Sequence, residues 1–294
     1  MKGSLFTSSF KLFVKRVLVF AAPLVIILAV VEVLIRHIPN DYSLKDRWMS
    51  KNSRHVKVLI LGSSHSFFGI DAKYIPRSFN AANFSQTFKY DWAIIKKYRW
   101  DSLETIIIPV DYFTLFYSLK DGPESWLVKN YNMYYGFNNY NPFENFEILG
   151  ESPRRNFRKL SDYYLRHRSK VWSDELGNGR APKTVNVDSG IVAVRKHTQR
   201  KLSVFRENVA YLDSIVNFRK TIIISTPTYK TYYENLDPEQ MSMTYAAIKK
   251  QNADYYDFMK DPSFNKEDFF DADHLNESGA KKFTLKLDSI LHLR

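Results

Sequence analysis

The sequence contains no cysteine among its 294 residues. Disulfide bonds, thiolate metal ligands and cysteine nucleophiles are therefore excluded, and the redox state of the compartment leaves no trace in the sequence. Acidic residues are in deficit, because 31 Asp and Glu stand against 43 Lys and Arg, which gives a formal net charge of +12. This excess favours contact with a polyanion or an anionic membrane surface, but it names no partner.

Internal repeats, low-complexity tracts and recognisable nucleic-acid-binding modules are absent as well. Because no such module accompanies the basic residues, nucleic acid is not expected as a partner. The length of the chain and its 45% of hydrophobic residues allow one catalytic domain with a short appendage.

One long hydrophobic run is present at residues 17–35, with the sequence VLVFAAPLVIILAVVEVLI. Its only charged residue, Glu32, lies near one end of the run, where a side chain can reach the lipid headgroups. A cleaved signal peptide would have a shorter run followed by small residues, and a core helix of a soluble protein needs apolar residues on one face only. The run therefore predicts an uncleaved membrane anchor.

Basic residues stand on both sides of this run, so the positive-inside rule discriminates weakly between the two orientations. We predict a cytoplasmic N-terminus, which makes the chain a single-pass protein of the inner (cytoplasmic) membrane with an extracytoplasmic, periplasmic domain. Residues 1–36 then form the N-terminal segment with the transmembrane anchor, residues 37–54 a polar juxtamembrane linker, and residues 55–294 the folded domain.

Five short apolar runs alternate with longer segments of helical periodicity in this domain. They span residues 56–61, 79–82, 105–110, 221–226 and 253–258. Three of them are continuously apolar and β-branched, as is typical of strands covered on both faces, so we predict a parallel, three-layer α/β fold. A helical pattern at 202–218 predicts core positions at Leu202, Phe205, Val209, Leu212, Ile215 and Val216.

Residues 115–200 depart from this pattern and are rich in aromatic and basic residues. One interpretation is a cap or groove for a glycan or another polyanion, in which rings stack on sugars and Arg or Lys side chains meet negative charge. The other is an irregular insertion with a solvated basic face. The sequence leaves both interpretations open.

The first predicted strand runs directly into Gly62-Ser63-Ser64. In open α/β folds the ligand crevice lies at the carboxyl ends of the strands, and a helix that begins there points free N–H groups at an incoming oxyanion. Gly62 permits the tight turn that such a junction needs. Ser64 is therefore a candidate nucleophile, although the same pattern also occurs as a simple helix cap.

Near the end of the domain, Asp271 stands three residues before His274. A carboxylate in this position can accept the imidazole Nδ1 proton and leave Nε2 free to deprotonate a hydroxyl. Two other interpretations exist. Asp271 and Asp273 can cap the helix that begins near Asn276, or His65, Asp271, Asp273 and His274 can together ligate a metal ion.

Taken together, the two segments resemble the first and last sequence blocks of the SGNH (GDSL) hydrolases. The first block is the strand followed by Gly-Ser-Ser-His-Ser at 62–66, and the last is Asp-Ala-Asp-His-Leu-Asn-Glu-Ser-Gly-Ala at 271–280. The resemblance spans roughly residues 55–285 and implies a flavodoxin-like three-layer parallel sheet, here with an N-terminal transmembrane helix. It further implies Ser64 as nucleophile, His274 as base and Asp271 as its orienting carboxylate, with no cofactor and no metal.

The resemblance also suggests the donors of an oxyanion hole. The backbone N–H of Ser64 is one, and that of Ser85 is another, because Ser85 stands where the second block of the family has a glycine. The third block supplies an asparagine side chain, and this chain has Asp111 there instead. Since an ionised carboxylate cannot donate a hydrogen bond, either the amide of Gln86 or Asn83 substitutes or the hole is weak, and Asp111 then caps a strand end.

Anchored relatives in this family commonly serve polysaccharide O-acetylation, deacetylation or D-alanyl transfer. The resemblance therefore implies a membrane-anchored serine esterase or acyltransferase that acts on acyl, chiefly acetyl, esters of a cell-envelope polysaccharide. The membrane, an acylated glycan and an acyl donor protein are the expected partners. Hydrolysis and transfer share one acyl-enzyme, so the sequence does not separate them. The alternative is a catalytically weak or inactive SGNH-fold protein that binds glycan or scaffolds an envelope assembly.

Overall fold

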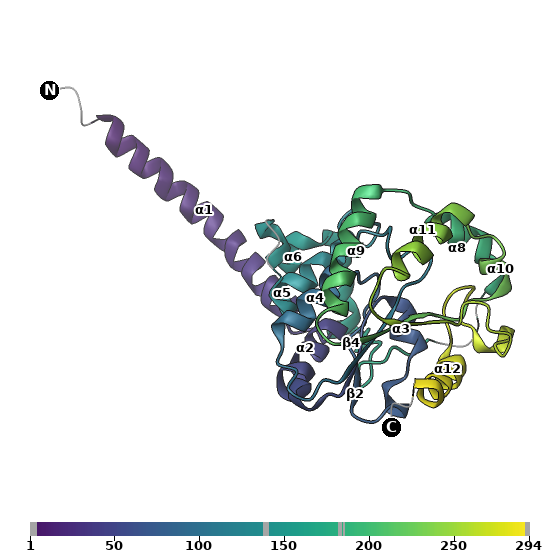
Figure 1. The fold of residues 1–294 in the computed structure, drawn as a ribbon. Coiled ribbons are helices and arrows are strands. Elements are labelled where there is room, and N and C mark those ends of the chain that lie inside the picture. The colour runs from purple at the N-terminus through teal and green to yellow at the C-terminus, as the bar shows by residue number, and fades with distance from the viewer. Residues whose placement is uncertain (1–4, 138–140, 182–183, 185, 292–294) are drawn as a thin grey trace. The chain divides into compact units, whose positions relative to one another are not determined.

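The structure, a computed structural model, describes residues 5–137, 141–181, 184 and 186–291 (Figure 1). The chain divides into two compact units. The smaller unit comprises residues 1–40 and 139–170, and the larger comprises residues 41–138 and 171–294.

A five-stranded parallel sheet forms the centre of the larger unit. Its strands are β1 (Val58–Ile60), β2 (Ser78–Asn80), β3 (Thr105–Pro109), β4 (Lys220–Ser225) and β5 (Asp254–Asp257). Their order is β2-β1-β3-β4-β5, which is one of the common orders of doubly wound sheets. All five strands lie within two residues of the predicted ranges, so the predicted parallel α/β sheet is confirmed.

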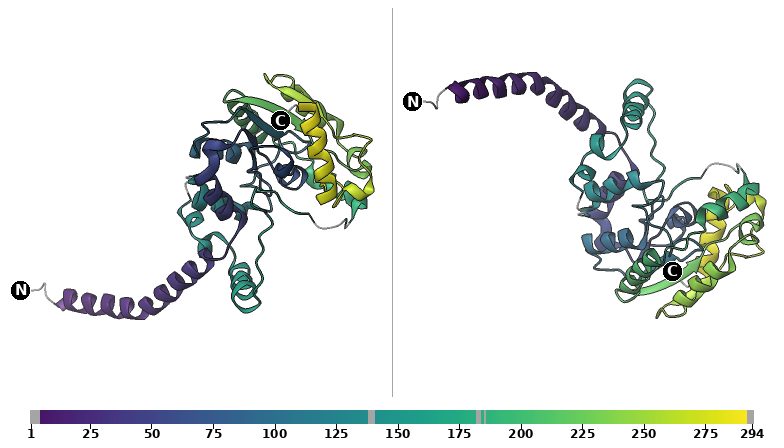
Figure 2. Two further views of the ribbon diagram at one scale, coloured as in Figure 1. Left: turned by 90° about the horizontal axis from the view of Figure 1, so that it is seen from below. Right: turned by 90° about the horizontal axis from the view of Figure 1, so that it is seen from above.

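Both faces of the sheet are covered, because successive side chains of each strand enter different core clusters. Leu59 and Ile223 belong to the larger cluster, which also holds buried side chains of α2, α4, α5 and α9. Val58 and Ile222 belong to a second cluster, which α12 covers. Figure 2 shows the yellow helix α12 at one side of the larger unit, where α3 (Ser64–Gly69) packs against it, whereas α2, α4, α5 and α9 cover the other face of the sheet. The larger unit therefore has three layers.

The α-helices of the larger unit vary from four to fifteen residues in length. They are α2 (Asp41–Asn52), α3 (Ser64–Gly69), α4 (Phe88–Lys97), α5 (Val128–Tyr135), α8 (Gly190–His197), α9 (Leu202–Val216), α10 (Lys230–Tyr233), α11 (Pro238–Ile248) and α12 (Glu277–Leu291).

The predicted core face of α9 is correct except at its first residue. Leu212, Ile215 and Val216 are buried, and Phe205 and Val209 pack against the larger cluster. Leu202, in contrast, is 53% exposed. Helical periodicity gives the angular position of a side chain but not how far along the helix its packing partners extend, and Leu202 begins the helix.

The predicted linker is wrong over most of its length. Residues 41–52 form helix α2, whose Tyr42 and Met49 are buried in the larger cluster, so the folded unit begins at residue 41 rather than at 55. These two apolar residues are seven positions apart and lie on one helical face, a signal that the surrounding charged residues obscure. The predicted insertion is also divided, because residues 139–170 belong to the smaller unit.

The smaller unit consists of a long helix and a short helical segment. The long helix is α1 (Leu5–Arg36), and the segment contains α6 (Glu147–Gly150), α7 (Pro153–Leu160) and a π-helical turn (Ser161–Leu165). From Phe10 to Arg36, α1 is long and apolar enough to cross a membrane, and an 18-residue stretch within it has a mean hydropathy of 2.9. The type of membrane and the orientation of the chain stay predictions.

Two leucines of α9 give a matched test of this packing. Leu212→Ala removes a fully buried side chain and is expected to lower the free energy of unfolding by about 2 to 5 kcal/mol. Leu202→Ala removes an exposed side chain from the same helix and is expected to change it by less than about 0.5 kcal/mol. Denaturant unfolding followed by tryptophan fluorescence measures both, and equal losses would contradict the assigned packing.

Candidate active site

The turn after β1 places Ser64 at the first position of α3. Gly62 has a φ of +108°, and a Cβ atom there would lie 2.7 Å from Cδ of Pro109, at the end of the neighbouring strand β3. The positive φ and the close approach of Pro109 both require glycine at this position. The N–H of Gly62 donates to Oδ1 of Asp91 at 2.9 Å, which fixes the turn from behind. Ser64 itself is partly exposed and accessible to a substrate.

The loop before α12 carries Asp271 and His274. Oδ1 of Asp271 accepts hydrogen bonds from the backbone N–H groups of Asp273 (3.1 Å) and His274 (2.9 Å). The same carboxylate contacts Nδ1 of the His274 ring, at 2.9 Å from Oδ1 and 3.1 Å from Oδ2. One side chain thus orders the loop and orients the imidazole.

The residues after His274 anchor this loop to α12, which explains the Leu-Asn-x-x-Gly pattern. The side chain of Asn276 accepts from the N–H of Gly279 at 3.0 Å and donates to two backbone carbonyls, those of Glu267 and Phe269. A Cβ atom on Gly279 would lie 2.0 Å from the carbonyl oxygen of Asp268, so the helix can approach the preceding turn only with glycine there.

The structure brings the three predicted catalytic side chains together. Nε2 of His274 lies 2.8 Å from Oγ of Ser64, and Nδ1 of the same ring faces Asp271. The series Asp271, His274, Ser64 therefore has the geometry in which a serine is activated by general base catalysis. His274 and Asp271 are partly buried, which limits competing water without closing the site.

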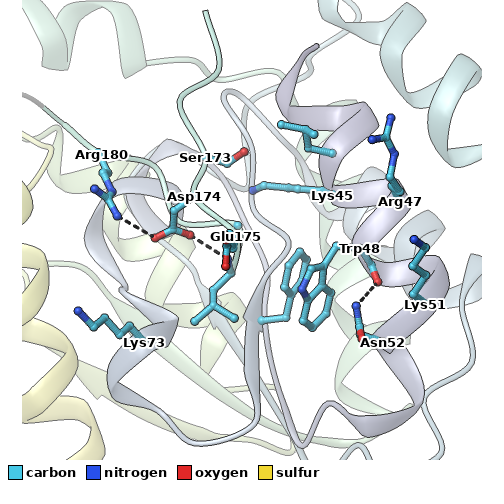
Figure 3. Close-up of a pocket in the computed structure, with 14 residues that line it drawn as sticks. Lys45, Arg47, Trp48, Lys51, Asn52, Lys73, Ser173, Asp174, Glu175 and Arg180 are labelled. Atoms are coloured by element: carbon cyan, nitrogen blue, oxygen red, sulfur yellow. Dashed lines mark hydrogen bonds and ion pairs between the residues drawn. The ribbon is translucent and has the colours of Figure 1, made fainter.

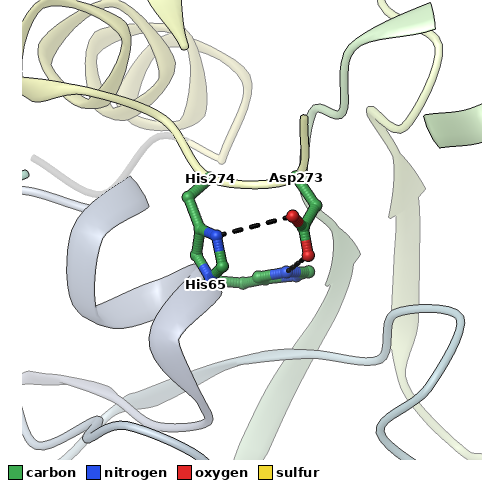
Figure 4. A group of neighbouring side chains, drawn as sticks. All are labelled: His65, Asp273 and His274. Carbon is green, nitrogen blue, oxygen red and sulfur yellow. Dashed lines mark hydrogen bonds and ion pairs between the residues drawn. The ribbon is translucent and has the colours of Figure 1, made fainter. Parts of the chain in front are cut away.

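A second ion-paired group lies directly behind this series. His65 is buried, and its Nδ1 lies 2.7 Å from Oδ2 of Asp111 while its Nε2 lies 3.3 Å from Oδ2 of Asp273 (Figure 4). Burial disfavours a charge on His65, but the two carboxylates outweigh it and raise its pKa to about 10. Burial also acts against ionised Asp273, yet the neighbouring His274 and His65 hold the pKa of Asp273 well below its usual range. At neutral pH His65 is therefore an imidazolium between two carboxylates.

His65, Asp273 and His274 are also the one group in the described part of the chain whose ligand atoms lie close enough to share a metal ion, within 4.8 Å of one another. Asp271 does not belong to that group. Both ring nitrogens of His65 already face carboxylates, so a metal ion bound to it would have to displace a proton that the site holds firmly. The hydrogen-bond pattern favours acid–base chemistry over metal ligation here.

Two backbone N–H groups were predicted as oxyanion donors. Those of Ser64 and Ser85 donate to no acceptor among the residues described. Ser85 has a φ of +54°, a conformation that favours glycine, in agreement with its assignment to the glycine position of the second block. The loop that carries Ser85 is joined to the nucleophile turn, because the N–H of Asn83 donates to the carbonyl of Gly62 at 3.3 Å.

The side chains predicted as further oxyanion donors are used elsewhere. The amide nitrogen of Gln86 donates to Asp91 at 2.6 Å and to the carbonyl of Ala81 at 3.3 Å, and that of Asn83 lies within reach of Gln86 and Tyr135. Gln86 and Asn83 are buried, so neither amide is free to substitute for the missing asparagine.

Asp111 is an ion-pair partner and not a donor. One of its oxygens faces His65, and the other accepts from the backbone N–H of Thr226 at 2.8 Å and from the Thr226 hydroxyl at 3.1 Å. The carboxyl ends of β1, β3 and β4 are joined in this way, since His65, Asp111 and Thr226 each follow one of these strands.

Sequence reasoning missed Thr226 and His197. His197 ends α8, stacks on Phe113 with ring centroids 4.4 Å apart, and places its Nδ1 2.9 Å from the hydroxyl of Tyr232. Burial lowers the pKa of His197 to about 4. The negative charge of Asp273 acts to raise this pKa, whereas His65 and His274 act to lower it further. The ring of His197 is therefore neutral at neutral pH. No signal marked His197 beforehand, because it lies in the stretch 115–200 whose pattern could not be interpreted.

An aromatic wall, defined here as Phe68, Phe84, Trp172 and Phe270, flanks His274. The ring of Phe68 meets the His274 ring edge to face at 6.0 Å, and Trp172 meets Phe68 at 6.2 Å and Phe84 at 6.0 Å. Trp172 is 43% exposed, and its backbone N–H donates to Oδ1 of Asp41 at 2.9 Å. The wall therefore offers an apolar surface next to the base.

The larger unit also has two cavities with basic side chains, and no residue of the Asp271, His274 and Ser64 series lines either of them. The first, of about 710 Å³, is lined by Trp48 and by several basic side chains (Figure 3). These are Lys45, Arg47, Lys51, Lys73 and Arg180. The second, of about 450 Å³, shares Lys73 and Arg180 with the first and is also lined by Phe68. Asp174 and Glu175 offset part of the positive charge in the first cavity.

Comparison of the chain with protein-family models, with curated proteins and with solved structures finds no match. The site therefore stands on its geometry, and membership of the SGNH hydrolases stays a prediction from the sequence.

The charge states of buried His65 and partly buried His197 predict opposite pH effects on stability. Because the folded pKa of His65 is raised to about 10 from 6.5, its contribution is complete below pH 6.5 and is lost as pH rises towards 10. For His197, whose folded pKa is about 4, stability is instead lost as pH falls from 6.5 towards 4. His65→Gln should flatten the alkaline limb of a plot of unfolding free energy against pH, and His197→Gln the acidic limb. An unchanged alkaline limb in His65→Gln would contradict the imidazolium.

Proposed function

We propose that this chain is a membrane-anchored serine esterase or acyltransferase of SGNH type that acts on acyl, chiefly acetyl, esters of a cell-envelope polysaccharide. The observation that carries the proposal is the hydrogen-bonded series of Asp271, His274 and Ser64, with 2.9 Å and 2.8 Å between successive partners. The agreement of Ser85 with a position that favours glycine supports the SGNH assignment.

In the proposed first step, Oγ of Ser64 attacks the ester carbonyl carbon while Nε2 of His274 takes the hydroxyl proton. The imidazolium that forms is stabilised by Asp271 and by Asp273, whose Oδ1 lies 3.6 Å from Nδ1 of His274. Collapse of the tetrahedral intermediate breaks the bond to the sugar oxygen, which takes the proton back from His274. The acyl group remains on Ser64.

In the second step, water or the hydroxyl of another sugar gives its proton to His274 and attacks the acyl carbon. The bond from that carbon to Oγ of Ser64 then breaks, and Oγ takes the proton back from His274. Water releases the free acid, and a sugar hydroxyl yields a new ester, so one site serves both hydrolysis and transfer. An acyl donor protein would then supply the first ester in the transferase version. No cofactor takes part in either step.

The oxyanion hole proposed here consists of the backbone N–H groups of Ser64 and Ser85. The family's third donor is missing, because Asp111 replaces the asparagine and is bound to His65. The loss of one such donor typically costs about 3 to 4 kcal/mol of transition-state stabilisation. The enzyme should therefore be slow towards simple esters and should depend on binding energy from the rest of its substrate.

A charged glycan fits the surroundings of the site. Sugar rings stack on aromatic faces, and Trp172 offers an exposed one beside Phe68, whose ring in turn contacts that of His274. The second cavity is lined by Phe68 of the aromatic wall and shares Lys73 and Arg180 with the first, whose excess of Lys and Arg side chains suits the anionic groups of a polymer. Helix α1 would hold the enzyme at the inner membrane, with its catalytic unit on the periplasmic side, where such polymers are found.

The second candidate is an SGNH-fold protein that binds glycan or scaffolds an envelope assembly with little or no catalysis. The observation that favours it is Asp111, which removes a donor from the oxyanion hole. The two candidates differ in whether Ser64 reacts.

The proposed nucleophile is tested by labelling the full chain in detergent with a fluorophosphonate serine probe. The wild type should label, and Ser64→Ala and His274→Ala should lose the label, because the first removes the attacking oxygen and the second its base. Ser63→Ala is the matched control, since the neighbouring hydroxyl is buried and has no hydrogen-bond partner among the described residues.

Turnover of an aryl acetate and of an acetylated polysaccharide, with and without a chelator, completes this test. Wild type that labels no better than Ser64→Ala and turns over neither substrate would favour the second candidate. Activity that a chelator abolishes would favour metal ligation by His65, Asp273 and His274 instead.

The aromatic wall predicts a dependence on substrate size. Trp172→Ala should raise KM for an acetylated polysaccharide several-fold and leave the kinetics of a small aryl acetate nearly unchanged, because a stacked aromatic contact contributes about 1 kcal/mol. Trp172→Phe keeps an aromatic face and should restore much of the loss. Equal effects on both substrates would show that Trp172 acts through the shape of the site rather than through glycan binding.

A further inference from the structure

A cluster of exposed apolar side chains marks the short helical segment of the smaller unit, residues 142–165. A soluble surface rarely gathers so many large apolar groups within one short segment. They are Phe143, Phe146, Leu149, Phe157, Tyr164 and Leu165. Phe157 and Leu165 are the most exposed, at 73% and 75%.

This segment is fixed to the carboxyl end of α1. The carboxylate of Glu32 accepts the N–H groups of Glu147 at 3.1 Å and Ile148 at 3.0 Å, which are the first residues of α6. Arg36 pairs with Glu32 and also donates to the carbonyl of Asn145 at 2.7 Å. The single acidic residue of the apolar run is thereby used to hold the segment where α1 would leave the membrane.

A second set of bonds ties the other end of the segment to α1 and stabilises its fold. The hydroxyl of Tyr164 donates to the carbonyl of Leu34 at 3.0 Å. Within the segment, Lys159 bridges Glu147 (3.2 Å) and Glu151 (2.5 Å), and the amide of Asn156 donates to the carbonyl of Glu147 at 3.2 Å. Polar side chains thus fill its interior, and its apolar side chains face outwards.

The charge on α7 matches an anionic lipid surface. Arg154, Arg155 and Arg158 are exposed, and α7 carries them beside the exposed ring of Phe157. Aromatic and basic side chains together are typical of helices that lie in the headgroup region, where rings enter the acyl boundary and cations meet lipid phosphates. Near the end of a membrane-spanning helix these groups stand at the depth of the headgroups.

We infer that residues 142–165 form an interfacial membrane-binding element that lies in the leaflet at the carboxyl end of α1. Phe157, Leu165 and their apolar neighbours enter the boundary between headgroups and acyl chains, and the three arginines of α7 bind anionic headgroups. The inference goes beyond the proposed chemistry and requires only that α1 crosses a membrane. Its functional effect is to add a second attachment to the single span.

The test uses the full chain in phospholipid vesicles and single nitroxide labels, which the absence of native cysteine permits. Labels are placed by Phe157→Cys and Leu165→Cys. Val25→Cys, in the middle of the apolar run of α1, serves as the lipid reference. Ile191→Cys, at a position 48% exposed in the larger unit, serves as an exposed apolar control.

Collisions with oxygen, which dissolves in lipid, and with a water-soluble nickel complex report the surroundings of each label. At 157 and 165 the ratio of oxygen to nickel collisions should exceed that at 191 several-fold and approach that at 25. A water-like ratio at 157 and 165, with a lipid-like ratio at 25, would overturn the inference and leave the anchor intact. Low collision rates with both reagents at 157 and 165 would also overturn it, because a second copy or another protein would then cover the segment.

The binding of anionic headgroups by the arginines of α7 is tested by a separate variant. Replacing Arg154, Arg155 and Arg158 by Gln should reduce the gain in oxygen-to-nickel ratio at 165 that phosphatidylglycerol produces over phosphatidylcholine alone. An equal gain in the variant would contradict headgroup binding by these arginines. Neither collision measurement depends on the reactivity of Ser64. A failure of the membrane-binding inference is therefore distinguishable from a failure of the proposed serine chemistry.

Discussion

The ion pair between His65 and Asp273 is the contact on which the site depends. His65 follows Ser64 in the chain, and Asp273 precedes His274, so two adjacent pairs of residues meet face to face. The contact of His65 with Asp273 at 3.3 Å lies beside that of Ser64 with His274 at 2.8 Å. Segments 210 positions apart in the sequence are thereby held in register. Because the imidazolium is buried between two carboxylates, replacing His65 by a neutral side chain leaves two buried like charges without their shared counter-charge.

This arrangement also gives a structural role to Asp111, which stands where the resemblance to SGNH hydrolases predicts an asparagine. A charged His65 needs a second carboxylate, and Asp111 at the end of β3 provides it. The same position cannot donate to an oxyanion. In the proposed mechanism the base and the nucleophile are strongly ordered and the set of oxyanion donors is reduced, which suits a reaction that gains its rate from binding a large substrate rather than from the ester alone.

Each of the two units has a feature suited to a membrane-associated polymer. In the larger unit, the aromatic wall stands next to His274, and one of the two cavities is lined by Phe68 of that wall. In the smaller unit, Glu32 and Arg36 hold an apolar and basic segment at the end of a helix able to span a bilayer. The basic residues behind the formal charge of +12 are therefore unevenly distributed, since some of them line the cavities and others lie on α7.

The sequence alone determined the parallel sheet, because continuously apolar β-branched runs are buried on both faces and leave a plain signal. It also determined the pairing of Asp271 with His274, which is local, and the apolar run of α1. The functions of His65, Asp111 and Thr226 were decided only by the tertiary structure, since ion pairs between strand ends have no fixed spacing in sequence. The same holds for α2, where Tyr42 and Met49 are buried among charged residues, and for Leu202, which lies beyond its packing partners. Local periodicity and spacing are properties of neighbouring residues, whereas burial and charge compensation depend on which distant segments meet.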